Sequence, residues 1–408
     1  MSFDFGDPFG WFGQWIRSLL EGIGLAPGFV SFLLSLVGAF LLGLVALLSA
    51  FGLIWVERKI VARIQDRLGP NRVGPFGLFQ TIADGLKLAT KELITPVGAY
   101  RIPYNLAPLL AVMSVVGIWA VVPLAPRLIG SDLNVGVLYV ISIGAVGTLA
   151  IILAGMSSNN KYALLGAFRT VAQMVSFAVP MVLALLVPVL LAGSMGMVQI
   201  TEAQRPVWFV VLAPFAALIF FISSLAEVGR APFDILEAES EIVAGFHIEY
   251  SGLRFGMFFV AEFLHAFTIS ALTTTLFFGG WQGPGATQFP LLGLLYFFIK
   301  TSLVYFVVIW IRGSFPRIRI DQMNNLNWKF FTPLALAGLV FTAVAEKLVS
   351  ELALNRVLLH IGANGLLLVL TLFALGIYAR RKRREMQGLA IRGPEAAVAS
   401  TAQASAKK

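Results

Sequence analysis

The stretch FVSFLLSLVGAFLLGLVALLSAFGLI, from Phe29 to Ile54, contains no charged residue and exceeds the roughly 20 apolar residues that a helix needs to cross a bilayer. Eight further apolar runs follow it along the chain. The predicted spans are Phe29–Ile54, Leu106–Leu124, Val135–Ala154, Val171–Leu191, Val207–Ala226, Phe255–Phe278, Leu291–Ile311, Phe331–Val349 and Leu352–Tyr378. The sequence therefore predicts an all-α polytopic membrane protein, a bundle of eight core transmembrane helices with a ninth at the C-terminal end.

The composition agrees with this fold class. Of the 408 residues, 58% are hydrophobic and only 12% are charged, and the mean hydropathy is +0.85. The chain has no cysteine, which excludes disulfides, thiolate catalysis and cysteine-bound zinc or iron–sulfur clusters within it. The net charge of +9 comes from residues between the apolar runs and near the C-terminal end, so membrane topology explains it better than nucleic acid does.

The basic residues also predict the orientation. The segment between the first two spans carries Arg58, Lys59, Arg63, Arg67, Arg72, Lys87, Lys91 and Arg101, whereas the next loop carries only Arg127. The protein is predicted to lie in the cell (inner) membrane. Because basic loops face the cytoplasm, its N-terminus is predicted outside and its C-terminus in the cytoplasm.

These boundaries divide the chain into four parts. We predict an N-terminal segment at 1–28 with an interfacial helix at Trp11–Leu20, and an eight-helix domain at 29–350 with cytoplasmic loops at 57–105, 155–170, 227–254 and 312–330. An extra transmembrane helix at 351–379 and a basic tail at 380–408, expected to be disordered, complete the chain.

The loop at 227–254 is acidic although its predicted side of the membrane favours positive charge. Its carboxylates are Glu227, Asp234, Glu237, Glu239, Glu241 and Glu249. Glu237 and Glu241 are spaced to share one helix face, and like charges this close raise each other's pKa, as a proton relay near neutral pH requires. A solvated acidic loop, or a docking patch for a basic partner, explains the composition equally simply.

Three ionisable residues lie inside predicted spans: Glu262, His265 and Lys300. A charge at mid-bilayer costs about 2.5–3.5 kcal/mol, so such residues normally face the bundle interior and often carry function. Glu262 is the stronger candidate, because His265 is explained by a hydrogen bond within the bundle and Lys300 by snorkelling to the interface.

The chain shows no motif for a bound cofactor. It has no P-loop, Gly22-Ile23-Gly24 lacks the rest of a dinucleotide fingerprint, and three histidines give little support for a haem. No metal site and no cofactor site is predicted. Any redox role needs an electron donor on another polypeptide of the same complex.

Four motifs, all on the predicted cytoplasmic side, resemble one family. They are ERKIVARIQDRLGPNRVGPFGLFQTIADGLKLATKE (57–92), SSNNKYALLGAFRTVAQ (157–173), AEVGRAPFDILEAESEIVAGFHIEYSGLRFGMFFVAE (226–262) and RGSFPRIRIDQMNNLNWK (312–329). Over roughly 29–349 the chain is similar to the quinone-site membrane subunit of bacterial respiratory NADH:quinone oxidoreductase, complex I. The resemblance implies a core of eight helices that forms a quinone chamber together with peripheral subunits.

The resemblance also implies partners and roles. Ubiquinone or menaquinone is then the substrate, flavin and iron–sulfur clusters reside on partner subunits, and small membrane-arm subunits and lipid contact the bundle. By similarity, Glu57, Arg58, Arg63, Asp66, Arg72, Phe233 and Asp234 belong to the quinone chamber and its entrance, while Glu227, Glu237, Glu239, Glu241, Glu249 and Glu262 belong to the proton path. The chain departs from the family at Ser176-Phe177-Ala178, where most members have a carboxylate at the last position, and in its ninth span.

Rival functions remain open at this level. Relatives of this family serve membrane-bound hydrogenases and ferredoxin-fed complexes. Interior charges also suit a stand-alone ion-coupled transporter, but such carriers usually show repeated halves, and the sequence shows no internal repeat. A purely structural membrane anchor would leave the acidic loop without a purpose.

Overall fold

The fold is described from a computed structural model, in which residues 8–24, 26–126, 128–235, 243–352, 355–373, 375–377 and 380 are placed well enough to describe. The chain divides into two compact units, Met1–Leu339 and Val340–Lys408. The predicted C-terminal tail lies outside the described residues except for Arg380.

Helices make up nearly all regular structure of the described part. They are α1 (Pro8–Gly22), α2 (Pro27–Ile64), α3 (Gln80–Thr90), α4 (Arg101–Ile118), α5 (Gly136–Ser157), α6 (Lys161–Ala192), α7 (Met197–Ala203), α8 (Phe209–Leu212), α9 (Pro214–Val228), α10 (Gly252–Phe277), α11 (Pro290–Ser314), α12 (Ile320–Leu326) and α13 (Thr332–Leu352). Short 3₁₀ turns at Pro75–Gly77 and Gly245–His247 and a π-helical turn at Asn327–Phe331 join some of them.

Eight helices in the described part are long and apolar enough to cross a membrane, which confirms the all-α polytopic class. They include the predicted ninth span, as a helix at Arg356–Ile377. The predicted fifth span, Val207–Ala226, differs from an unbroken helix. The chain breaks between α8 and α9, because Pro214 has no amide hydrogen to continue α8 and Ala213 adopts φ −142°, ψ 63°.

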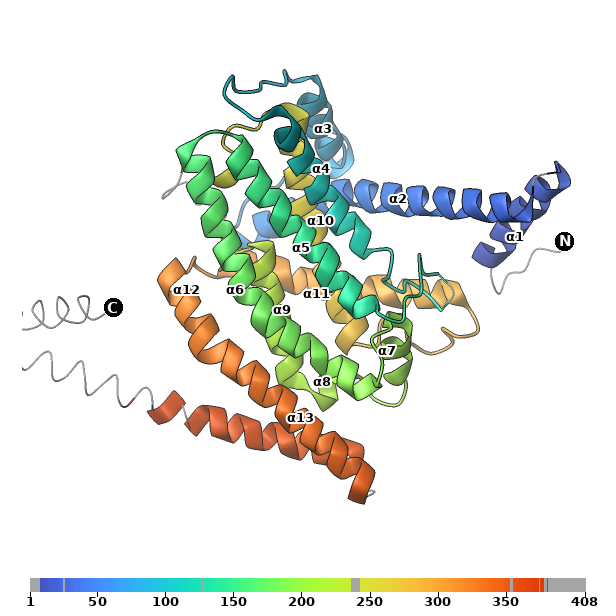
Figure 1. Cartoon of the computed structure of the whole chain (residues 1–408), viewed down its shortest axis with the longest axis vertical. Coiled ribbons are helices and arrows are strands. Elements are labelled where there is room, and N and C mark those ends of the chain that lie inside the picture. Colours follow the sequence, from blue (N-terminus) through green and yellow to red (C-terminus); the bar gives the residue numbers. More distant parts are fainter. Residues whose placement is uncertain are drawn as a thin grey trace, which may run out of the picture. The chain divides into compact units, whose positions relative to one another are not determined.

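Helix α10 occupies the middle of the first unit. In the apolar stretch that makes α10 a candidate spanning helix, 67% is buried, the highest share among the spanning helices. Helix α10 packs against α2, α4, α9 and α11. Thr268, Ser270, Thr273, Thr274 and Thr275 are buried on this helix, and each hydroxyl donates to the carbonyl four residues earlier. These bonds let a Ser/Thr-rich helix lie in the interior without unpaired hydroxyl donors. Helix α6 packs against both α5 and α9, and Figure 1 shows these three helices as one group in the bundle.

A side-chain hydrogen bond replaces a backbone hydrogen bond that is missing at a proline in α6. Pro180 cannot donate to the carbonyl of Ser176, one turn earlier. The Nδ2 of Asn327, in the π-helical turn before α13, donates to that carbonyl at 2.6 Å. The pair ties the eighth predicted span to the fourth, next to the Ser176-Phe177-Ala178 segment.

Lys300 of α11 contacts the segment that follows the end of α10. Its Nζ donates to the carbonyls of Phe278, Gly280 and Gln282 at 2.9, 3.2 and 2.8 Å and lies 4.6 Å from the ring centroid of Trp208. These carbonyls follow the last turn of α10, where a cation is favoured by the helix dipole. The observed contacts therefore give Lys300 a structural task.

The second unit contains the end of α13 and the helix Arg356–Ile377. The carboxylate of Glu346 meets Nη2 of Arg356 at 2.7 Å and Nε2 of His360 at 2.8 Å. We call these three residues the C-terminal cluster. Through these contacts of Glu346 with Arg356 and His360, the helix Arg356–Ile377 is held to α13 by specific polar side chains.

Candidate functional site

A network of charged side chains lies between α2, α10, α11 and the segment after α9. Glu57 accepts from Nη1 of Arg230 at 3.0 Å and from the hydroxyl of Tyr305 at 3.0 Å, and it also pairs with Arg312. Nε of Arg230 lies 3.3 Å from a carboxylate oxygen of Glu262. We call these five residues the Glu57 network. Its two carboxylates and two guanidinium groups balance in charge, which is the condition for keeping such groups out of water.

Burial makes this network different from a surface ion pair. The side chains of Glu57 and Arg230 are only 4% and 2% exposed. The guanidinium of Arg230 also lies 4.4 Å from the ring centroid of Phe263, on α10. Removing one partner from such a pair leaves an uncompensated buried charge, at a cost of about 3–5 kcal/mol.

Local structure explains how Arg230 reaches the network. Helix α9 ends at Gly229 in the left-handed conformation, with φ 75°, so the chain turns immediately before Arg230. Gln173 of α6 holds the turn, because its Nε2 donates to the carbonyls of Ala226 and Phe233 at 2.8 Å each. Gln173 is fully buried, and no sequence pattern singled it out.

The C-terminal end of α2 also makes a charged contact with α3. Helix α2 runs on to Ile64 instead of ending at Ile54, which places Glu57 within the helix and Arg58 beside it. Nη1 of Arg58 meets the carboxylate of Asp84, on α3, at 2.6 Å. These side chains are 39% and 28% exposed, so this pair is far less buried than Glu57 and Arg230.

The other charged residues of this region that were predicted for the quinone chamber lie on the outside of the chain. Arg63, Asp66 and Arg72 are exposed, at the end of α2 and in the turn-dense segment after it. Gly77 keeps that segment compact: a Cβ there would lie 2.2 Å from the carbonyl oxygen of Pro70, and its φ is +75°.

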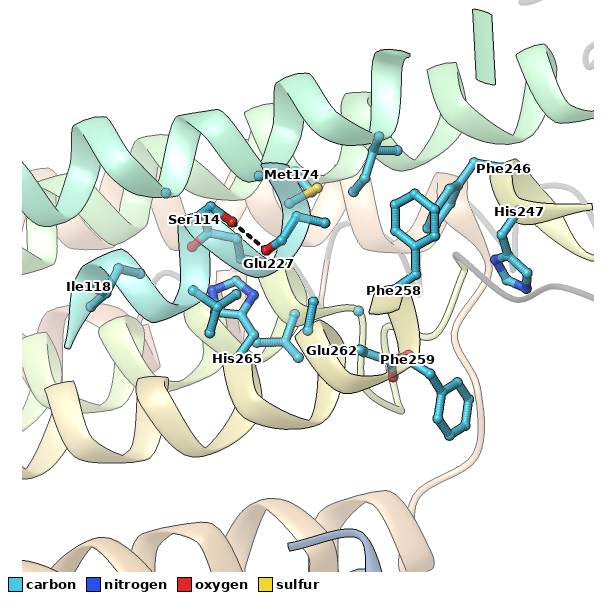
Figure 2. A pocket seen from close by; sticks show the side chains of 18 of the residues that line it. Ser114, Ile118, Met174, Glu227, Phe246, His247, Phe258, Phe259, Glu262 and His265 are labelled. Carbon is cyan, nitrogen blue, oxygen red and sulfur yellow. Dashed lines mark hydrogen bonds between the residues drawn. The ribbon is translucent and has the colours of Figure 1, made fainter. Parts of the chain in front are cut away.

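A narrow cavity of about 90 Å³ borders the network. Its ionisable lining residues are Glu227, Asp234, His247, Glu262 and His265. Glu262 belongs both to this lining and to the Glu57 network, so the two features are continuous. Figure 2 shows Glu227, His247, Glu262 and His265 around the cavity, with Phe246, Phe258 and Phe259 toward one end.

His247 lies in the 3₁₀ turn before α10, between the rings of Phe246 and Phe255 at centroid distances of 5.1 and 5.3 Å. Burial lowers the pKa of His247 from 6.5 to about 4. The imidazole is therefore neutral at physiological pH and adds no positive charge beside the acids of the cavity.

A second cavity of about 340 Å³ begins where the first one ends. Both share Ile118, Gly144, Met174, Glu227 and His265 in their linings. The remainder of the second lining is mainly apolar and includes Ala178, the position at which the resemblance leads one to expect a carboxylate. The acidic cavity therefore opens into a largely apolar one within the bundle.

The remaining predicted residues lie apart or outside the described chain. Phe233 is buried, and its ring centroid is 5.4 Å from that of Phe177. Glu249 accepts from Nδ2 of Asn160 at 2.6 Å and lines a different cavity of about 660 Å³. Glu237, Glu239 and Glu241 lie outside the described residues.

Sequence reasoning missed several members of the site. Tyr305 and Arg312 were not singled out, since one sits in an apolar run and the other at the end of a span. Arg230 had one available signal, as one of two basic residues in an acidic loop. Within the described residues, no group of three or more His, Asp or Glu side chains forms a possible metal site.

The fold and this site define a class: polytopic α-helical membrane proteins that hold ionised side chains between their helices. The family model described as NADH dehydrogenase matches residues 37–343. The chain belongs to this family.

Individual relatives support the same assignment, and each of them is named as a subunit of NADH-quinone oxidoreductase. The relative from Dehalococcoides mccartyi (strain CBDB1) is 48% identical over 298 residues, which is 73% of this chain and 82% of the relative. The relative from Carboxydothermus hydrogenoformans is 46% identical over 330 residues (80% and 93%). That from Geobacillus kaustophilus is 44% identical over 335 residues (82% and 98%).

Proposed function

We propose that this chain is the quinone-site membrane subunit of a proton-translocating NADH:quinone oxidoreductase. It acts as one part of that translocase and contains no complete active site alone. The carrying observation is the continuity of ionisable groups from the buried Glu57 network, through Glu262, to Glu227 and His265 within the bundle. Family membership and the relatives from NADH-quinone oxidoreductases support the same function.

The quinone headgroup, as substrate, meets a chamber formed with peripheral subunits at the inner end of α2. Glu57, Arg58, Arg63, Asp66 and Arg72 contribute from α2 and the following segment, and Phe233 and Asp234 contribute from the segment after α9. Electrons come from iron–sulfur clusters and flavin on partner subunits, because this chain has no cysteine to bind a cluster.

The proton path uses the remaining carboxylates of this region. We assign Glu227, Glu237, Glu239, Glu241, Glu249 and Glu262 to it. Glu262 gives a physical reason for coupling, since it pairs with Arg230 at one end and lines the cavity at the other. A change of charge at the chamber then alters how tightly a proton is held in the cavity.

The proposal places the chain in the cell inner membrane, with its N-terminus outside and its C-terminus in the cytoplasm. Small membrane-arm subunits and lipid cover its outer helices. The corresponding component of a membrane-bound hydrogenase or ferredoxin-fed complex is the main alternative, and a stand-alone transporter is the other.

Mass spectrometry of the native complex, purified through a tag on this chain in mild detergent, tests the proposal together with an NADH:quinone assay on the same sample. We expect flavin and iron–sulfur subunits to co-purify with quinone reductase activity. Co-purified hydrogenase subunits would identify the chain as the corresponding subunit of a membrane-bound hydrogenase. A chain that purifies alone would favour the stand-alone transporter.

The proton-path assignment has its own test. Glu237→Gln or Glu241→Gln should lower quinone reduction and proton pumping together while the complex still assembles. The matched control is Glu202→Gln, whose exposed carboxylate pairs with Arg205 at the other end of the bundle. A variant that assembles and pumps like the parent removes that residue from the path.

A further inference from the structure

The junction of the two cavities contains a feature that the proposed function leaves unexplained. Glu227 of α9 and His265 of α10 line both cavities, and among the described residues they are the only ionisable ones in the lining of the second cavity. Figure 2 shows the imidazole of His265 directed toward the side chains of Glu227 and Ser114 across the cavity. Glu227 and His265 are therefore the titratable groups at the junction for a proton that leaves the acidic cavity toward the second one.

The imidazole of His265 lacks the hydrogen bond that a structural histidine needs. Within the described part of the chain, no protein group hydrogen-bonds either of its ring nitrogens. The five buried hydroxyls farther along the same helix are all bonded, and His360 is paired with Glu346. The side chain of His265 is half-buried and faces the two cavities, so the expectation that it is hydrogen-bonded within the bundle is not met, and its ring nitrogens remain available to groups in the cavities.

The chemistry of imidazole suits this position. One ring nitrogen accepts a proton while the other releases one, so a single side chain can pass a proton between two compartments. The first cavity, at about 90 Å³, exceeds the roughly 30 Å³ share of one water, so a hydrogen-bonded path to Glu227 has room.

We propose that His265 is a proton-relay residue that connects the acidic cavity to the apolar one. The proton moves from the carboxyl of Glu227 to one ring nitrogen, forming that N–H bond as the O–H bond breaks. The other ring nitrogen releases its proton to water in the second cavity. Rotation of the neutral ring then turns its unprotonated nitrogen back toward Glu227, and a proton from the acidic cavity restores the carboxyl of Glu227. This relay rests on the proposed function, of which it is one step.

Every element packed around the ring contributes to its surroundings. Helix α4 presents Ser114, α6 presents Met174, and α9 presents Glu227. On α10 itself, Glu262 lies one turn away, and the segments before α10 add Asp234 and His247. The charged groups that face the relay from the described residues are thus acids, which favour arrival of a proton at the ring.

The test compares His265→Gln with the parent complex in proteoliposomes, with NADH-driven proton pumping and quinone reduction measured on the same sample. Glutamine keeps hydrogen-bonding capacity but takes up no proton. We expect pumping and coupled turnover to fall on the order of 10²-fold, as for loss of a positioned acid–base group. Ser270→Ala is the matched control, since this buried α10 hydroxyl bonds only within its helix and lines neither cavity.

Chemical rescue separates a relay from a packing role. In His265→Ala, added imidazole should restore pumping, whereas added thiazole, of similar shape but much weaker basicity, should not. Parental pumping in His265→Gln, or equal rescue by both compounds, would overturn the relay. If the parent itself shows no quinone-dependent pumping, the proposed function fails, which is a distinguishable result.

Discussion

The Glu57 network and the C-terminal cluster use the same chemistry in different places. Each joins helices through a carboxylate and arginine, but Glu57 and Arg230 are almost completely buried, whereas the side chains of Glu346 and Arg356 are 28% and 32% exposed. The first lies within the part matched by the family model and borders a cavity, while the second lies beyond residue 343. The two clusters therefore differ in the burial of their carboxylate–arginine pair and in their continuity with a cavity, not in the presence of an ion pair.

The largest effect is expected from Glu57→Gln. Arg230 and Arg312 would then face one carboxylate instead of two, so the complex should lose about 3–5 kcal/mol of stability at this site and most of its quinone reductase activity. Assembly, thermal inactivation and NADH:quinone turnover are the measurements. Glu202→Gln, in an exposed pair, should change stability by less than about 1 kcal/mol. Equal effects of the two variants would contradict the comparison.

A pH series on His247→Gln tests whether water is excluded from the imidazole of His247 at the acidic cavity. Because the pKa of His247 is about 4 in the fold and 6.5 in its ordinary state, its contribution to stability is present above pH 6.5. This contribution is lost as the pH falls from 6.5 to about 4, by at most about 3 kcal/mol. The parent should therefore lose more thermal stability than His247→Gln over this range. Parallel pH profiles would show that His247 is hydrated.

Asn327→Leu tests the neutral contact between the π-helical turn and α6. It leaves the carbonyl of Ser176 without a donor beside Pro180, at a cost of about 1–3 kcal/mol. Thermal inactivation of the purified complex should detect this loss. Asn325→Leu, on the exposed side of α12, is the control and should have a smaller effect. The reverse order would show that the π-helical turn does not depend on this bond.

The smallest effect is expected from removing the additional helix. Truncation after Leu352 should leave turnover per assembled complex near that of the parent, since the Glu57 network is intact. It should lower stability slightly, because Glu346 loses Arg356 and His360. Adding Glu346→Gln to the truncated chain should recover part of this loss. Failure of the truncated chain to assemble would instead show that the ninth helix is required for the complex.

Much of the fold followed from local sequence. Long apolar runs predict spanning helices because each residue's transfer into lipid is a local property, and within the described residues helices of spanning length were confirmed for all predicted spans except the fifth. The break before Pro214 was missed because hydropathy does not register the absent amide hydrogen, although the proline was visible. The end of α2 was misplaced for a related reason, since charged residues lower hydropathy without ending a helix.

The site divides in the same way. Sequence alone determined that this chain spans a membrane, carries interior charges at Glu262, His265 and Lys300, and binds no cysteine-held cluster. Only the tertiary structure decided their partners: Lys300 meets backbone carbonyls, His265 faces a cavity, and Glu262 meets Arg230. Tyr305 lies 248 positions from Glu57 in the chain. No local pattern encodes such a contact, because it depends on how whole helices pack.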